Sequence, residues 1–122
     1  MKALSLKQPY ASFIAIGKKT IETRTWSTNY RGKLLIVSSK SMDKDYSYPN
    51  FLSLGLPFGK ALAVVELVDC RPMKREDEKL AMFPYHSELY AWVLSDIKKV
   101  EPFPVKGQLR LFEVEYKEKR WQ

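Results

Sequence analysis

The sequence contains very little cysteine and histidine, and it has no long apolar run. A single cysteine, Cys70, cannot form an internal disulfide, and a single histidine, His86, has no partner at the spacing of a metal site. No uninterrupted apolar run comes near the roughly 20 residues that a membrane-spanning helix needs, and the N-terminal MKALSLKQPY lacks the apolar segment of a signal peptide. We therefore expect a soluble, cytoplasmic protein with no metal, no other cofactor and no membrane partner.

Acidic residues are too few to balance the basic ones. The chain has 21 Lys and Arg against 14 Asp and Glu, which gives a formal net charge of +7. Between Lys18 and Lys40 there are six basic residues and one acid, so most of the excess charge lies in this stretch. By contrast, residues 71–79 mix four bases with three acids, which is typical of a solvated surface. The basic stretch predicts an anionic partner, with nucleic acid first.

Hydrophobic and charged residues occur in the balance of a folded protein, at 45% and 29% of the 122 residues, and no repeat or linker interrupts them. Apolar periodicity predicts a short helix that begins at Pro9 and ends at Gly17. The irregular spacing of the other elements predicts an α+β fold, a small mixed β-barrel of about five or six strands with a few short helices packed outside. Strands are expected at residues 3–6, 20–26, 33–39, 61–69, 89–96 and 109–116, an extended piece at 100–107 and a short helix at 50–54.

Four motifs carry a resemblance to a known family. They are Gln-Pro-Tyr at residues 8–10, GKKTIETR at 17–24, YRGKLLIVSSK at 30–40 and Pro-x-Lys-Gly at 104–107. In this order they resemble the ASCH domain, the activating signal cointegrator homology family of the PUA-like superfamily. The resemblance implies a single ASCH domain over residues 1–122, with a PUA-like β-barrel. Within the family, the sequence is most similar to the branch that includes the endothelial-overexpressed lipopolysaccharide-associated factor.

The resemblance also implies a cleft lined by a GxKxxExR motif, which is proposed to handle RNA or a modified nucleoside. In this sequence Gly17, Lys19, Glu22 and Arg24 occupy the positions of that motif. Their chemistry suits such a ligand, because a lysine offers a point charge and an arginine can donate two parallel hydrogen bonds to a phosphate or a base edge. Glu22 and Arg24 are two residues apart on one strand face, close enough to orient each other.

Four further residues surround this motif and are expected to contribute to binding. Tyr10 and Trp26 can stack on a base, a contact worth about 1 to 3 kcal/mol in single-strand binders. Arg31 and Lys40 add positive charge around the cleft, whereas Trp92 is expected to lie in the core. We expect a monomer that binds RNA or a modified nucleoside, and DNA would also suit a basic cleft.

An enzymatic alternative comes from relatives in the same family that remove the acetyl group of N(4)-acetylcytidine with a lysine, a threonine and a glutamate. Here Lys19 would be the base, but Glu22 occupies the position that matches the threonine, so activated water would have to replace the hydroxyl nucleophile. The second carboxylate could be Glu66, which is unusual on an apolar strand face, or else Glu76 or Glu78. Binding is the first hypothesis, nucleoside amide hydrolysis is the alternative, and a partner-binding adaptor and a ribonuclease rank below both.

Overall fold

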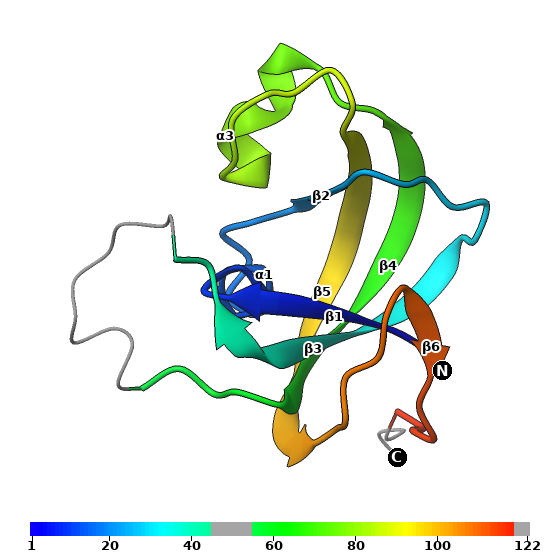
Figure 1. Cartoon of the computed structure of the whole chain (residues 1–122). Coiled ribbons are helices and arrows are strands. Elements are labelled where there is room, and N and C mark those ends of the chain that lie inside the picture. Colours follow the sequence, from blue (N-terminus) through cyan, green and yellow to red (C-terminus); the bar gives the residue numbers. More distant parts are fainter. Residues whose placement is uncertain (45–54, 119–122) are drawn as a thin grey trace.

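A single curved sheet of six strands organises the part of the chain that the computed structural model describes, residues 1–44 and 55–118 (Figure 1). Helix α1 packs against the sheet, and helix α3 follows the 3-10 helix η1 and contacts β2. Neither α-helix in this part of the chain, six and four residues long, is long and apolar enough to cross a membrane. The elements are β1 (Lys2–Gln8), α1 (Tyr10–Ala15), β2 (Ile21–Arg24), β3 (Gly32–Met42), β4 (Lys60–Pro72), η1 (Arg75–Asp77), α3 (Glu78–Ala81), β5 (Tyr90–Pro104) and β6 (Leu111–Glu113).

The sheet has the strand order β2-β5-β4-β3-β1-β6, with β1 and β3 parallel and every other pair antiparallel. Within the described ranges, the edge strands β2 and β6 each pair with one neighbour only, so the sheet curves but does not close. The expected mixed β-barrel is therefore confirmed in part: the described strands form a mixed six-stranded sheet with short helices outside it, but this sheet is not closed into a barrel. The edges are too short for closure, because β2 has four residues and β6 has three.

Buried side chains cover both faces of the sheet. On β3, Leu34, Leu35, Ile36 and Val37 are all 0% exposed, and alternate residues join two different hydrophobic clusters. Because both faces of this strand are covered, its sequence is continuously apolar rather than alternating. Trp92 is also 0% exposed, which confirms its expected place in the core.

The periodicity of the sequence predicted most elements correctly. Helix α1 buries Ala11 and Ile14, and Gly17 follows it at a φ of +81°, a conformation that favours glycine. All six strands are present, although β5 continues through the piece expected only to be extended and ends at Pro104. Helix α3 was not expected, and the helix expected at residues 50–54 lies outside the described residues.

Candidate functional site

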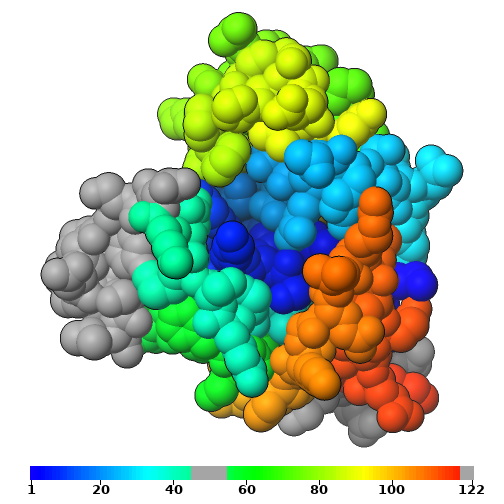
Figure 2. Space-filling model, viewed as in Figure 1, coloured from blue at the N-terminus to red at the C-terminus, as the bar shows by residue number. Residues whose placement is uncertain are grey.

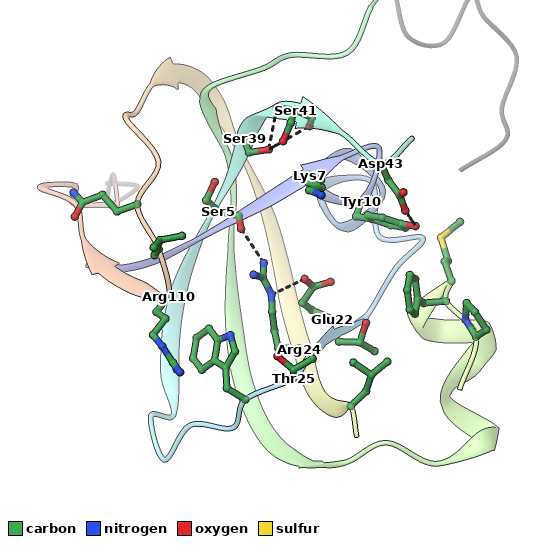
Figure 3. Close-up of a pocket in the computed structure, with 18 residues that line it drawn as sticks. Ser5, Lys7, Tyr10, Glu22, Arg24, Thr25, Ser39, Ser41, Asp43 and Arg110 are labelled. Atoms are coloured by element: carbon green, nitrogen blue, oxygen red, sulfur yellow. Dashed lines mark hydrogen bonds and ion pairs between the residues drawn. The ribbon is translucent and has the colours of Figure 1, made fainter. Parts of the chain in front are cut away.

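A cavity of about 900 Å³ opens between β2 and β1, where one edge of the curved sheet turns toward the other (Figures 2 and 3). Strand β1 contributes to it through alternation, since Ser5 and Lys7 face the cavity while Leu4 and Leu6 are buried in the core. The segment before β6 forms the opposite wall. The lining residues are Ser5, Lys7, Tyr10, Glu22, Thr23, Arg24, Thr25, Trp26, Ser39, Ser41, Asp43, Met82, Phe83, Pro84, Leu89, Gln108, Leu109 and Arg110.

Arg24 bridges the two sides of this opening. Its Nη2 donates to the backbone oxygen of Ser5 at 2.8 Å, and its Nε donates to Oε2 of Glu22 at 3.0 Å (Figure 3). The pairing of β1 with β6 ends at Leu4. The backbone oxygen of the next residue, Ser5, therefore accepts its hydrogen bond from the Arg24 side chain and not from a backbone amide of β6. Among the described residues, the remaining amino group of Arg24 has no hydrogen-bond partner, and it can donate to a ligand.

Lys19 lies behind Glu22 and does not line the cavity. The side chain is 1% exposed, and its Nζ lies 3.5 Å from Oε1 of Glu22 and 5.1 Å from the centre of the Tyr10 ring. The ammonium also donates to the backbone oxygen of Ala81, the last residue of α3. Burial lowers the pKa of Lys19, and the neighbouring Glu22 carboxylate opposes that effect. Glu22 is therefore the charged group of this pair that a ligand meets.

Local backbone structure explains why Lys19 points inward. After α1, the amides of Lys18 and Lys19 both donate to the Phe13 oxygen, at 2.9 and 3.1 Å, so the chain reverses at Gly17. The backbone of the next residue, Thr20, is held by two hydrogen bonds. Its amide donates to the backbone oxygen of Leu80, and its backbone oxygen accepts from the amide of Leu94. Lys19 is thus held between α1, β2 and the C-terminal end of α3, where a lysine can satisfy the last helical carbonyls.

Aromatic side chains occupy two parts of the cavity wall. On one side, the Tyr10 hydroxyl donates to Asp43, and the Tyr10 ring meets Phe83 edge to face at 6.2 Å. On the other side, Trp26 packs edge to face on Trp92 at 4.8 Å, and the guanidinium of Arg110 lies 4.5 Å from the centre of the Trp26 ring. Arg110 therefore covers one face of Trp26, and an entering base would stack on this arginine or displace it.

Two of the lining residues have an uncommon backbone conformation. Met82 and Arg110 have φ values of 53° and 59°, in the left-handed region that non-glycine residues rarely adopt. Met82 immediately follows α3, and Arg110 immediately precedes β6. Such residues persist where the surrounding structure over-determines them, and they are concentrated at ligand sites.

The α3 segment is anchored by an ion pair that the sequence did not reveal. Asp77 is 6% exposed, and both of its carboxylate oxygens accept from Arg71, at 2.7 and 2.9 Å. One of these oxygens also accepts from the backbone amide of Lys74 at 2.8 Å. The expectation that residues 71–79 form an ordinary solvated surface is therefore wrong at Asp77, because the Asp77 carboxylate is buried in an ion pair with Arg71 of the same segment.

We expect Asp77→Ala to lower the free energy of unfolding by about 2 kcal/mol at neutral pH, the scale of hydrogen bonds to a charged group. The hydrogen bond from Arg71 holds the pKa of Asp77 below its ordinary value of 3.8. This stabilisation is therefore fully present above pH 3.8, and it disappears as the pH falls through the lower pKa that Asp77 has in the folded protein. Urea unfolding of both proteins at neutral and strongly acidic pH measures the difference. A difference that did not shrink in acid would contradict the role of this carboxylate.

The structure brings half of the expected site residues together. Tyr10, Glu22, Arg24 and Trp26 line one cavity, and Lys19 lies directly behind them. The cavity is also lined by Ser5, Lys7, Asp43 and Arg110, which were not among the residues expected from the sequence. The alternation of residues 4–7 could have indicated the first two, but no local pattern connects residue 110 to residue 26.

The remaining expected residues lie outside this cavity. Gly17 is in the exposed turn after α1, and Arg31 pairs with Asp69 at 3.6 Å on the surface. Lys40 lines a neighbouring cavity. Glu66 is half-buried on β4 opposite Lys33, and it lies near Tyr30 rather than near Lys19.

The other two candidate carboxylates do not line the cavity either. Glu76 is exposed, and Glu78 accepts from the backbone amide of Tyr85 at 2.6 Å. The structure therefore brings neither of them beside Lys19, whose carboxylate neighbour is Glu22.

The curved mixed sheet with a cavity between its edges defines a small α+β domain. The model of the ASCH domain family matches residues 4–104, and the chain belongs to that family. It is 27% identical over 133 residues to activating signal cointegrator 1 of Mus musculus and to that of Homo sapiens. The match covers 93% of this chain but only 22% of each of these relatives.

Solved structures show the same fold. The ASCH protein of Zymomonas mobilis superimposes with a TM-score of 0.67 at 14% identity, over 93% of this chain and 87% of that one. A point variant of the same protein gives a TM-score of 0.64 at 13% identity, over 93% and 89% of the two chains. These identities are too low to transfer a function, so the similarity concerns the fold alone.

Proposed function

We propose that the cavity binds one nucleotide unit of RNA or a modified nucleoside. The observation that carries this proposal is Arg24, a guanidinium fixed by Glu22 and Ser5 with one amino group directed to a cavity of about 900 Å³. That volume lies within the range of small-molecule sites. A fixed arginine loses little conformational freedom on binding, which favours a specific hydrogen bond to an anionic or polar group.

The other lining groups match the parts of a nucleotide. Lys7, Arg24 and Arg110 supply positive charge for a phosphate, and Glu22 can accept from the exocyclic amino group of a base. The Trp26 ring with its Arg110 guanidinium offers a flat surface for stacking. This set favours a ligand that combines an anion, a flat ring and hydrogen-bond donors.

Membership of the ASCH domain family supports the proposal that the cavity binds a nucleotide. The matching relatives are named activating signal cointegrator 1, and this chain spans only about a fifth of their length. Within the proposal we retain the finer assignments made from the sequence. These are the branch of the endothelial-overexpressed lipopolysaccharide-associated factor, a monomeric state, a cytoplasmic location and DNA as a possible second ligand.

Lys7→Ala tests the binding proposal, because Lys7 lines the cavity and its side chain is not buried in the core. We expect about a fivefold loss of affinity for a single-stranded RNA of about eight nucleotides, and a salt dependence whose logarithmic slope is smaller by about 0.7. Fluorescence anisotropy at several salt concentrations measures both quantities. Lys98→Ala is the matched control, since Lys98 is an exposed lysine of β5 that does not line the cavity. Equal losses in the two variants would contradict the proposed site.

The Lys19 and Glu22 pair favours a second candidate function, hydrolysis of an N(4)-acetylcytidine-type amide. Lys19, the base expected from the sequence, does not line the cavity, whereas Glu22 does. We therefore propose Glu22 as the base that takes a proton from water, with Lys19 as a positioning residue behind it. The resulting hydroxide adds to the acetyl carbon, the carbon–nitrogen bond breaks, and the exocyclic nitrogen receives the proton as acetate leaves. The unpartnered amino group of Arg24 could stabilise the developing oxyanion.

Chromatography of N(4)-acetylcytidine incubated with the pure protein tests this candidate. Turnover that disappears in Glu22→Gln, and that shifts its pH profile in Lys19→Met, would support it. An absence of turnover by the wild-type protein at neutral and alkaline pH would eliminate hydrolysis and leave the binding proposal unchanged.

A further inference from the structure

A second cavity, of about 720 Å³, lies directly beside the first. The two cavities share four lining residues, Ser5, Ser39, Gln108 and Leu109, so they are adjacent compartments on one surface. Figure 2 shows this surface between the turquoise C-terminal end of β3 and the orange segment that precedes β6. A ligand longer than one nucleotide could therefore continue from one compartment into the next.

The two cavities differ in charge. The first combines its basic side chains with two carboxylates, Glu22 and Asp43, which can accept hydrogen bonds from a base. The second is lined by Lys40 and Lys106, and none of the described residues that line it is acidic. The stem of Lys40 also passes close to Gly59, where an added Cβ would lie 3.6 Å from it. An all-cationic compartment suits a phosphate, whereas the mixed compartment suits the polar edge of a base.

From these observations we propose that a single strand of nucleic acid crosses both cavities. Its recognised base occupies the first cavity, and the backbone phosphate of the adjoining nucleotide lies between Lys40 and Lys106 in the second. This inference rests on the proposed function and deepens it, because it assigns a strand rather than a free nucleoside as the natural ligand.

The segment that separates the cavities fits a stacked or splayed strand. Leu109 stands on the shared wall and is 93% exposed, the highest value among the exposed large hydrophobic residues in the described part of the chain. Gly107 lets this segment approach β1, because a Cβ at that position would lie 2.9 Å from Oγ of Ser5. An exposed apolar side chain between two nucleotide sites can contact the face of a base and keep neighbouring bases apart.

The experiment compares two probes, cytidine 5′-monophosphate and a cytidine-rich single-stranded RNA of about eight nucleotides. We expect the double variant Lys40→Gln/Lys106→Gln to bind the RNA about tenfold more weakly. Its salt-dependence slope should be smaller by about 0.7, since the two lysines hold one phosphate and each neutralised phosphate of a single strand contributes about 0.7. Binding of the monophosphate should stay within about twofold of wild type. Lys98→Gln/Lys117→Gln removes the same charge from lysines that line neither cavity, and it should leave both probes unaffected.

The outcomes separate this inference from the proposed function. Suppose that the monophosphate binds, but that the salt dependence of RNA binding has the same slope in Lys40→Gln/Lys106→Gln as in wild type. The second cavity then does not hold a phosphate, and the inference is overturned. If neither probe binds the wild-type protein, the proposed function fails together with the inference. A loss confined to the RNA, and absent from the control variant, confirms a strand across both cavities.

Discussion

Glu22→Ala is expected to lower the free energy of unfolding by about 3 kcal/mol at neutral pH. The substitution leaves the Lys19 ammonium, which is 1% exposed, without its carboxylate partner, and it removes the acceptor of Arg24 Nε. Breaking a buried ion pair from one side is costly because the remaining charge stays away from water without compensation. Chemical denaturation of the wild-type protein and the variant measures this difference.

The same variant should recover stability as the solution becomes alkaline. Burial holds the pKa of Lys19 below its ordinary value of 10.5, and the loss of Glu22 removes the neighbour that opposes this effect. Between the lowered folded value and 10.5 the unfolded chain binds more protons than the folded one, so the stability of the variant rises with pH across that window. The difference in the free energy of unfolding between wild type and Glu22→Ala should therefore become smaller as the pH approaches 10.5.

Lys19→Met provides the control for this interpretation. It keeps an unbranched side chain of similar length and removes the charge, so Lys19→Met/Glu22→Ala should be more stable than Glu22→Ala alone. A loss below about 1 kcal/mol in Glu22→Ala, the scale of an exposed ion pair, would show that the pair is solvated. Equal stability of the single and double variants would show that Lys19 does not depend on Glu22.

Arg24→Ala is expected to weaken RNA binding by about 100-fold, the upper range for hydrogen bonds to a charged group. The variant loses the guanidinium that lines the cavity, and it leaves the Glu22 carboxylate with the buried Lys19 ammonium as its one remaining ion-pair partner among the described residues. It also removes the 2.8 Å bond to the Ser5 oxygen, so the two edges of the sheet lose their side-chain bridge. Anisotropy titrations at constant salt measure the loss.

Two further variants make this prediction specific. Arg24→Lys keeps a positive charge but presents its donors from a single nitrogen, without the planar guanidinium whose separate nitrogens reach Glu22 and Ser5. Its affinity should therefore lie between those of wild type and Arg24→Ala. Arg75→Ala is the matched control, because Arg75 is exposed over Tyr85 and does not line the cavity. If Arg24→Ala kept its fold by circular dichroism and bound RNA as wild type does, the site would have to be placed elsewhere.

Much of the fold could be predicted from the sequence, because its signals are local. The spacing of Tyr10, Phe13 and Ile14 predicted a helix, and Gly17 predicted its end at a position whose φ of +81° suits glycine. Continuous apolar runs predicted the buried strands. The GKKTIETR motif also predicted that Glu22 and Arg24 act together, and their 3.0 Å contact confirms the pairing.

Other features depended on distances that no local pattern contains. Lys19 was expected to line a cleft, yet it is buried behind Glu22, because the reversal after α1 directs it toward the end of α3. Glu66 was considered as its partner because an acid among apolar residues is unusual, but β4 places it beside Lys33 and Tyr30. A strand pattern shows which residues share a face, but it does not show which other strand that face meets.

The sequence by itself determined the family, the α+β class, the order of the elements and the excess of positive charge. Only the tertiary structure decided that the sheet stays open and that Arg24 bridges its edges through Ser5. It alone brought Lys7, Arg24 and Arg110 around one cavity. The physical reason is that residue identity and periodicity fix how each segment is buried, whereas the curvature of the whole sheet fixes which distant segments meet.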